Sequence, residues 1–291
     1  MTYWLLRMMR KVAQVLPLRV CYAAAVLFSR IAWLVLPGQR RNATDNMAQV
    51  LGRDRTDPEA RRKARDSFKF YAYYMVDFLR LPNTDPAEID AKVRLDFLPD
   101  LDAALSAGRG VVFISAHAGN WDTVSSALVR RGYPVTVVVD TFHPPKLNDL
   151  VQGHRCSHGT KVIQLEDSAR RVLGTLRKNG ILGLLIDIPS PENGVQVHFF
   201  GKPAYVPAGP ALLALKTGAR VLAGIVIRNP DHSFTGLVTS QFDLESTGDF
   251  SMDVKLLTQR IVDTIEGFIK EYPEQWFIFR PMWPRDASLN A

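Results

Sequence analysis

Two side chains with the types and spacing needed for acid–base chemistry, His117 and Asp122, lie in the stretch Ser115-Ala-His117-Ala-Gly-Asn-Trp-Asp122. On one continuous helix they would point about 140° apart and could not touch. If a strand ends at His117 and the chain turns at Gly119, Asp122 can reach back to the imidazole. A carboxylate on one ring nitrogen fixes the tautomer, so that the other nitrogen can act as a general base on a hydroxyl. A capping aspartate and a histidine with a structural role in the loop fit the same spacing equally well.

The elements that must position this pair follow from the hydrophobic pattern. Short apolar runs, typical of strands buried on both faces, occur at 111–115, 135–139, 181–186 and 221–227. Helices are predicted at 121–131, 167–178, 208–217 and 253–271. Strands that alternate with helices predict an α/β fold with a mostly parallel central sheet and flanking helices. His117 would then lie at the carboxyl edge of the sheet, where open α/β folds bind their ligands.

The first 81 residues differ from the rest in charge and hydropathy. Residues 1–80 hold 15 Lys/Arg against 6 Asp/Glu, whereas the remainder holds 21 against 23. Arg19 and Arg30 bracket an uncharged run of only ten residues, too short for a simple membrane span. We expect two helices that lie in or against the lipid headgroup layer, although an ordinary helical subdomain has nearly equal support. A further helix is predicted over 57–81, with a dense aromatic half that is either core or the lining of a lipid path.

Several kinds of site have no support in the sequence. It contains no phosphate-binding loop, no nucleophile elbow and no C-x-x-C pair, and its G-x-G at 108–110 precedes a strand instead of following one. Positive charge confined to the N-terminus does not predict a nucleic-acid partner. The dense triplet His154-Arg-Cys156-Ser-His158 is a weak metal pattern without partners elsewhere, so no metal is expected.

The chain resembles the lysophospholipid acyltransferase superfamily, specifically its branch of lipid A late acyltransferases and phosphatidylinositol mannoside acyltransferases. The stretch from His117 to Asp122 matches that superfamily's H-x-x-x-x-D/E box. Further matches in family order are Pro17-Leu, Gly38-Gln-Arg-Arg-Asn-Ala, Asn46, Arg155-x-x-x-Gly159, Phe199-Phe-Gly201, Pro207-Ala-Gly-Pro and Pro273-Glu-Gln-Trp276 with Arg280. The aspartate that closes the box, with Gly-Asn-Trp before it, looks more like the mannoside enzymes. The segment Thr141-Phe-His143-Pro-Pro also differs from the basic stretch common in the lipid A branch.

The resemblance implies one acyltransferase domain over 1–291, with 1–81 as an N-terminal membrane-associating helical region. It implies transfer of an acyl chain from acyl-CoA or acyl carrier protein to a hydroxyl of a glycolipid acceptor, phosphatidylinositol mannoside-like or lipid A-like. No cofactor is required. The location implied is the cytoplasmic face of the bacterial inner membrane, as a peripheral or monotopic protein bound to membrane lipids.

The resemblance also implies roles for single residues. His117 would be the general base and Asp122 would orient it. In the family, charged groups that face the histidine complete the pocket, and by position they resemble Asp140, Arg155, and either Asp187 or Glu192. A non-catalytic, membrane-associated lipid-binding protein on the same fold is the alternative, although such a protein has no need of an intact His117/Asp122 pair.

Overall fold

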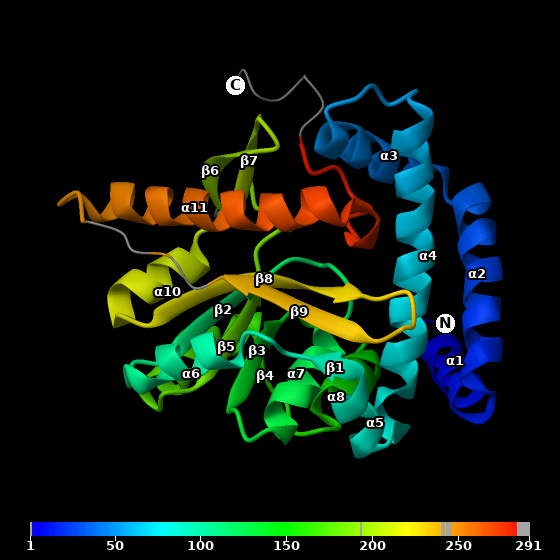
Figure 1. The fold of residues 1–291 in the computed structure, drawn as a ribbon, viewed down its shortest axis with the longest axis horizontal. Coiled ribbons are helices and arrows are strands. Elements are labelled where there is room, and N and C mark those ends of the chain that lie inside the picture. The colour runs from blue at the N-terminus through cyan, green and yellow to red at the C-terminus, as the bar shows by residue number, and fades with distance from the viewer. Residues whose placement is uncertain (1, 193, 240–241, 243–245, 284–291) are drawn as a thin grey trace.

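The computed structural model describes residues 2–192, 194–239, 242 and 246–283, and centres on a sheet of seven strands within these residues (Figure 1). The strand order is β1-β9-β8-β2-β5-β3-β4, and every neighbouring pair is parallel except β8 and β9. The strands are β1 (Val93–Arg94), β2 (Val111–Ser115), β3 (Val135–Val139), β4 (Lys161–Gln164), β5 (Ile181–Leu185), β8 (Arg220–Arg228) and β9 (Phe234–Thr239). The predicted α/β class with a mostly parallel sheet is confirmed.

Helices cover both faces of this sheet. The first face packs against α9 (Ser168–Arg177), α10 (Gly209–Thr217) and α11 (Phe250–Glu271). The second face packs against α5 (Pro86–Lys92), α6 (Leu98–Ser106) and α7 (Trp121–Arg130), while α8 (Pro145–Cys156) contacts the edge strand β4. In Figure 1, α11 lies above strands β8 and β9, and α6 and α7 lie below them. The four predicted helices are present as α7, α9, α10 and α11, within a few residues of their predicted bounds, whereas α8 was not predicted.

The N-terminal region is helical throughout, in four segments. These are α1 (Thr2–Val15), α2 (Leu18–Val35), α3 (Pro37–Leu51) and α4 (Pro58–Arg80). Asp57 caps α4 by accepting a hydrogen bond from the backbone N–H of Glu59, with Pro58 at the first helical position. Figure 1 shows α2 beside α4, and Cys21, Tyr22, Ala25 and Ser29 are the residues that α2 buries. By length and composition α2 could also cross a membrane.

Several elements were missed by the sequence pattern. The antiparallel hairpin β6 (Gly194–Phe199) and β7 (Lys202–Pro207) packs against α11 outside the main sheet. Strand β4 is short and carries polar residues at both ends, and α3 has a polar sequence without a clear apolar stripe. Weak hydrophobic periodicity leaves such segments without a signal, and tertiary contacts decide their structure.

Candidate active site

His117 and Asp187 meet because their strands are neighbours. Strands β2 and β5 pair in parallel with Ser115 opposite Leu185, so residues two positions beyond each strand end lie at the same edge of the sheet. The backbone N–H of Ile186 also donates to the carbonyl of Ser115, at 3.0 Å, which continues the pairing past the strand ends. This is the carboxyl edge, as expected for His117.

The Asp187 carboxylate binds His117 through both the ring and the backbone. The Nδ1 atom of His117 lies 2.7 Å from Oδ1 of Asp187, and the backbone N–H of His117 donates to Oδ2 at 2.8 Å. The indole N–H of Trp276 donates to the same Oδ2, also at 2.8 Å. On the other side, the carbonyl of His117 accepts a hydrogen bond from the backbone N–H of Phe277. Asp187 and Trp276 are buried, whereas 24% of the His117 side chain is exposed.

The charge state of Asp187 fixes the tautomer of His117. Burial alone would raise the pKa of Asp187, but the imidazole of His117 and the hydrogen bonds from His117 and Trp276 outweigh burial and lower this pKa below its ordinary value. An ionised carboxylate can only accept hydrogen bonds, so Nδ1 of His117 carries the proton that it donates. The other ring nitrogen, Nε2, is therefore left unprotonated when the imidazole is neutral, and it can accept a proton from a substrate.

The lowered pKa of Asp187 predicts a pH dependence of stability. Since the folded pKa lies below the unfolded value of about 3.9, the stability that Asp187 contributes is full above that value and is lost as pH falls through the folded pKa. We expect the difference in Tm between wild type and Asp187→Asn to shrink as the pH is lowered from about 5 to about 3. Thermal unfolding followed by circular dichroism measures it. A difference in Tm that widens as the pH is lowered would contradict the lowered pKa of Asp187.

Asp122 does not bind His117 in the structure, which corrects the expected pairing. Its Oδ2 accepts a hydrogen bond from the Tyr74 hydroxyl at 2.7 Å, and its Oδ1 lies 3.1 Å from Nε of Arg155. Burial and the charge of Asp122 raise the pKa of Tyr74, so the phenol stays protonated and acts as the donor. The reason for the difference is positional: Tyr74 of α4 and Arg155 of α8 bind the two oxygens of Asp122, and Nδ1 of His117 is bound by Asp187.

The other predicted site residues are placed as follows. Arg155 is mostly buried and also donates to Gln152 at 3.1 Å, so its guanidinium binds other groups of the protein. Asp140 follows β3 and Glu192 lies in the turn before β6; both are exposed. Within the described residues neither carboxylate contacts His117. The structure thus brings together His117 with Asp187 and Asp122 with Arg155, and leaves the remaining two at the surface.

An aromatic wall stands beside the histidine. The ring of Trp121 lies edge-on to the imidazole of His117, with 5.3 Å between centroids, and stacks on Tyr74 at 4.5 Å. Phe277 contacts this group from the C-terminal segment and Tyr71 from α4. The aromatic half of α4 is therefore partly core and partly a wall beside His117, and the lining of a lipid path stays a prediction. Trp276 and Tyr74 were missed as contributors to the site because their partners are distant in sequence.

The turn after His117 requires glycine. Gly119 has φ of +64°, and a Cβ built on it would lie 1.8 Å from the carbonyl oxygen of Val226. Directly after it, the Asn120 side chain caps α7 by accepting from the backbone N–H of Thr123 at 3.0 Å. Strand, glycine turn and helix thus follow one another as the sequence predicted, and the cap by Asn120 is an addition from the structure.

A buried polar network supports this turn from behind and was not predicted from the sequence. Oδ1 of Asp77 accepts a hydrogen bond from the Tyr22 hydroxyl at 2.6 Å. Its Oδ2 accepts from Asn120 at 3.3 Å and forms an ion pair with Arg228. One carboxylate of α4 therefore connects α2, the cap of α7 and strand β8. In the sequence, Asp77 is a single acidic residue within the aromatic half of the predicted helix, and the pattern does not show which partners bind it.

Removing Asp77 is expected to destabilise the fold. Asp77→Ala leaves the buried guanidinium of Arg228 without its counter-ion, which lowers the free energy of unfolding by about 3–5 kcal/mol. Urea unfolding measures the change. Asp90→Ala is the matched control, because it breaks the exposed pair with Arg130 and is expected to cost about 0–1 kcal/mol. Equal losses in the two variants would show that the buried network contributes no more than a surface pair.

The two histidines of the triplet His154-Arg-Cys156-Ser-His158, one on α8 and one directly after it, have structural partners. Nδ1 of His154 lies 3.0 Å from the carbonyl of Phe78, and Nε2 of His158 lies 2.7 Å from the carbonyl of Leu81. Both contacts attach α8 to the end of α4. Among the described residues no group of three His, Cys, Asp or Glu could hold a metal ion.

Comparison with known proteins gives one consistent family. The family model described as bacterial lipid A biosynthesis acyltransferase matches residues 1–285. A phosphatidylinositol mannoside acyltransferase of Mycolicibacterium smegmatis is 32% identical over 249 residues, which cover 84% of this chain and 79% of that protein. A phosphatidylinositol mannoside acyltransferase of Mycobacterium tuberculosis is 32% identical over 229 residues, or 76% of this chain and 70% of that protein.

Proposed function

The chain belongs to the family of bacterial lipid A biosynthesis acyltransferases, and from this premise we propose that it transfers a fatty acyl chain from an acyl thioester to a hydroxyl of a glycolipid. The observation that carries the proposal is the His117–Asp187 pair, with Nε2 of the imidazole available at the carboxyl edge of the sheet. The similarity to the two mannoside acyltransferases favours a phosphatidylinositol mannoside-like acceptor over a lipid A-like one.

The proposed reaction needs no nucleophile from the protein. Nε2 of His117 takes the proton of the acceptor hydroxyl as the oxygen attacks the thioester carbonyl. The new C–O ester bond forms, the C–S bond breaks, and the leaving thiolate receives the proton. Asp187 holds the ring through Nδ1 and balances the positive charge that the imidazole carries between the two proton transfers. The donor is acyl-CoA or acyl carrier protein, and the half-buried indole of Trp121, which contacts the imidazole, offers apolar surface for its acyl chain.

The other polar residues take supporting roles in this proposal. Asp122, bound by Tyr74 and Arg155, positions the first turn of α7 and with it Trp121, which contacts the imidazole. Asp140 and Glu192 lie exposed near the strand ends, where a polar acceptor headgroup can reach them. Their role as substrate-binding residues stays a prediction.

A panel of acceptors tests the proposed function. Purified protein is incubated with acyl-CoA labelled in the acyl chain and vesicles that contain either a phosphatidylinositol mannoside, a lipid A precursor or a diacylglycerophospholipid without a sugar. We expect base-labile label in the mannoside fraction. Label in none of the three, with acyl carrier protein as the alternative donor as well, would contradict the proposal.

The acceptor is a lipid, and the N-terminal helices offer a surface for the membrane that holds it. Their exposed large apolar residues are Trp4, Leu5, Met8, Met9, Val12, Val15, Leu16, Val20, Leu27, Phe28, Ile31, Leu34, Val35 and Leu36. Basic side chains interrupt this surface at Arg7, Arg10, Lys11, Arg19 and Arg30. Because one side of α2 packs on α4, we propose that α1 and α2 lie in the headgroup layer at the cytoplasmic face of the inner membrane.

Membrane binding is expected to depend on the exposed face of α2. Phe28 is 64% exposed and Leu34 70% exposed, so a Phe28→Asp/Leu34→Asp variant should lose sedimentation with anionic vesicles. Leu165→Asp, at a 59% exposed leucine outside these helices, is the matched control and should sediment as wild type. Rising salt should weaken wild-type binding only in part, since each basic residue contributes about 1 kcal/mol and the apolar face stays inserted. Unchanged sedimentation of the double variant would place the membrane contact elsewhere.

A further inference from the structure

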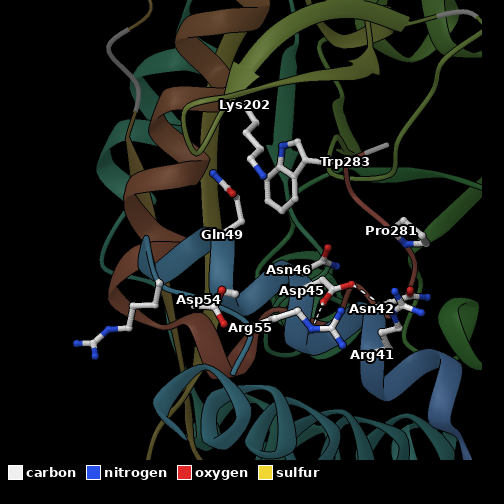
Figure 2. A pocket seen from close by; sticks show the side chains of 12 residues that line it. Arg41, Asn42, Asp45, Asn46, Gln49, Asp54, Arg55, Lys202, Pro281 and Trp283 are labelled. Atoms are coloured by element: carbon white, nitrogen blue, oxygen red, sulfur yellow. Dashed lines mark ion pairs between the residues drawn. The ribbon is translucent and has the colours of Figure 1, made fainter. Parts of the chain in front are cut away.

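A cavity of about 420 Å³ lies between α3, the start of β7 and the C-terminal segment, and the function proposed above leaves it without a role. We call it the α3 cavity. Figure 2 shows Arg41 and Arg55 gathered around Asp45 on one side, and Lys202 extending toward the indole of Trp283 on the other. Its volume lies within the range of small-molecule sites, so a compact polar headgroup fits inside it.

The α3 cavity is separate from the site around His117. The backbone N–H of Phe277 donates to the carbonyl of His117, and Asn46 of α3 donates to the carbonyls of Ile278 and Arg280, both at 2.9 Å. Phe277 and Ile278 are buried, so the chain that connects the two sites packs into the core instead of lining a channel. A ligand of the α3 cavity would therefore be distinct from the reacting thioester and its acceptor.

Positive charge predominates in the α3 cavity. Arg41 and Arg55 each lie 3.9 Å from a carboxylate oxygen of Asp45, so one carboxylate faces two guanidinium groups at more than hydrogen-bond length. Lys202 is exposed and has no ion-pair partner among the residues that the structure describes. These three cations favour a phosphate ester, whose oxygens accept hydrogen bonds from several donors at once.

Two further groups of the cavity suit hydroxyls and carbon. Oδ1 of Asp54 accepts hydrogen bonds from the backbone N–H and the hydroxyl of Thr56, at 2.7 and 2.6 Å, and its Oδ2 can accept one from a ligand hydroxyl. The indole N–H of Trp283 donates to the carbonyl of Phe199 at 3.2 Å, which fixes the ring at the cavity wall as apolar surface. Cations, a carboxylate and an indole together match a phosphate that is attached to a short hydroxylated carbon chain.

The α3 cavity lies beside the end of α2 that we place at the membrane. Helix α3 begins two residues after α2 ends, and Leu34 and Val35 in the last turn of α2 are exposed (Figure 1). Arg40 fixes this corner, because it donates to the carbonyl of Trp33 at 3.3 Å and lies over the indole. Arg41 is roughly 6 Å along α3 from its first residue, and the headgroup layer is roughly 5–7 Å thick. A lipid beside α2 can therefore place its phosphate at Arg41.

We propose that the α3 cavity binds the headgroup of an anionic glycerophospholipid with free hydroxyls, of which phosphatidylglycerol is the simplest. Arg41, Arg55 and Lys202 bind its phosphate, and Asp54 accepts from a headgroup hydroxyl. The lipid is a ligand that holds α3 at the headgroup layer, and it is not an acyl acceptor. The proposal rests on the membrane placement of α2 in the proposed function. Inorganic phosphate shares the phosphate chemistry and is separated from the lipid by experiment.

The test is calorimetric titration with dihexanoyl phosphatidylglycerol, used as monomers in solution so that no bilayer is present. We expect binding to wild type and a loss of affinity of roughly tenfold or more in Arg55→Gln/Lys202→Gln. The matched control, Lys161→Gln/Arg177→Gln, removes two exposed cations on β4 and α9 and should bind as wild type. Dihexanoyl phosphatidylcholine, which has neither net charge nor hydroxyl, and inorganic phosphate should each bind wild type at least about tenfold more weakly. Circular dichroism confirms that each variant is folded.

Other outcomes overturn the proposal. No binding of phosphatidylglycerol, or equal binding by wild type and Arg55→Gln/Lys202→Gln, would remove the lipid from the α3 cavity. Inorganic phosphate that binds as tightly as the lipid would assign the cavity to a soluble anion, and equal binding of phosphatidylcholine would refute selection by charge. Because the titration contains neither thioester nor glycolipid, lipid binding without acyl transfer would refute the proposed transfer alone. Acyl transfer without lipid binding would refute the lipid site alone.

Discussion

Asp187→Asn is expected to lower kcat by a factor on the order of 10³ to 10⁴, more than Asp122→Asn. The amide oxygen can keep the position of Oδ2, where it still accepts from the backbone N–H of His117 and from Trp276. The amide NH₂ then faces Nδ1 of the imidazole as a donor. Nδ1 must accept, the proton moves to Nε2, and the nitrogen that should act as base is occupied.

Asp122→Asn is the informative comparison. Its carboxylate binds Tyr74 and Arg155, so the change weakens the support of α7 without reversing the tautomer of His117. We expect lower thermal stability and a smaller loss of kcat. Steady-state kinetics of both variants with the same donor and acceptor measures the ratio. A larger loss of kcat in Asp122→Asn than in Asp187→Asn would return the orienting role to Asp122.

His117→Ala should lower transfer by at least about 10²-fold, because no other base in the described structure has the same position at the carboxyl edge. KM for the donor should change much less than kcat, since the imidazole acts mainly in the transition state. His198→Ala is the matched control: His198 is exposed on β6, and its hydrogen bonds to Gln259 come from the backbone. Transfer by His117→Ala within a few-fold of wild type would show that His117 is not the base.

The sequence predicted the framework of this site and left its central contact open. Apolar runs located β2 and β5, and the box located His117 at the end of β2. Packing across the whole sheet decides which strands become neighbours. The hydrophobic pattern within one strand does not identify the strand that pairs with it. The family resemblance left Asp187 and Glu192 as alternatives for one pocket residue. The contact of Asp187 with Nδ1 of His117 became visible only through the parallel pairing of Ser115 with Leu185.

The same limit explains why the sequence predicted a contact of Asp122 with His117 that the structure does not form. Local spacing shows that a carboxylate can reach a histidine five residues away. It does not show which other side chains the fold brings to that carboxylate. Tyr74 lies 48 positions before Asp122 and Arg155 33 positions after it. The network around Asp77 was hidden for the same reason, because its partners come from α2, α7 and β8. Buried polar networks assemble from distant segments, so single-sequence patterns describe their members only one at a time.

The measurement that tests the central claim most directly is the stoichiometry of acyl transfer. Wild-type protein is incubated with acyl-labelled CoA thioester and vesicles with or without a phosphatidylinositol mannoside, and free thiol and label in lipid are followed together. Direct attack by an acceptor hydroxyl predicts one thiol released for each ester formed in the glycolipid, with both dependent on the acceptor. Thiol release at the same rate without acceptor, or label that accumulates on the protein, would contradict it.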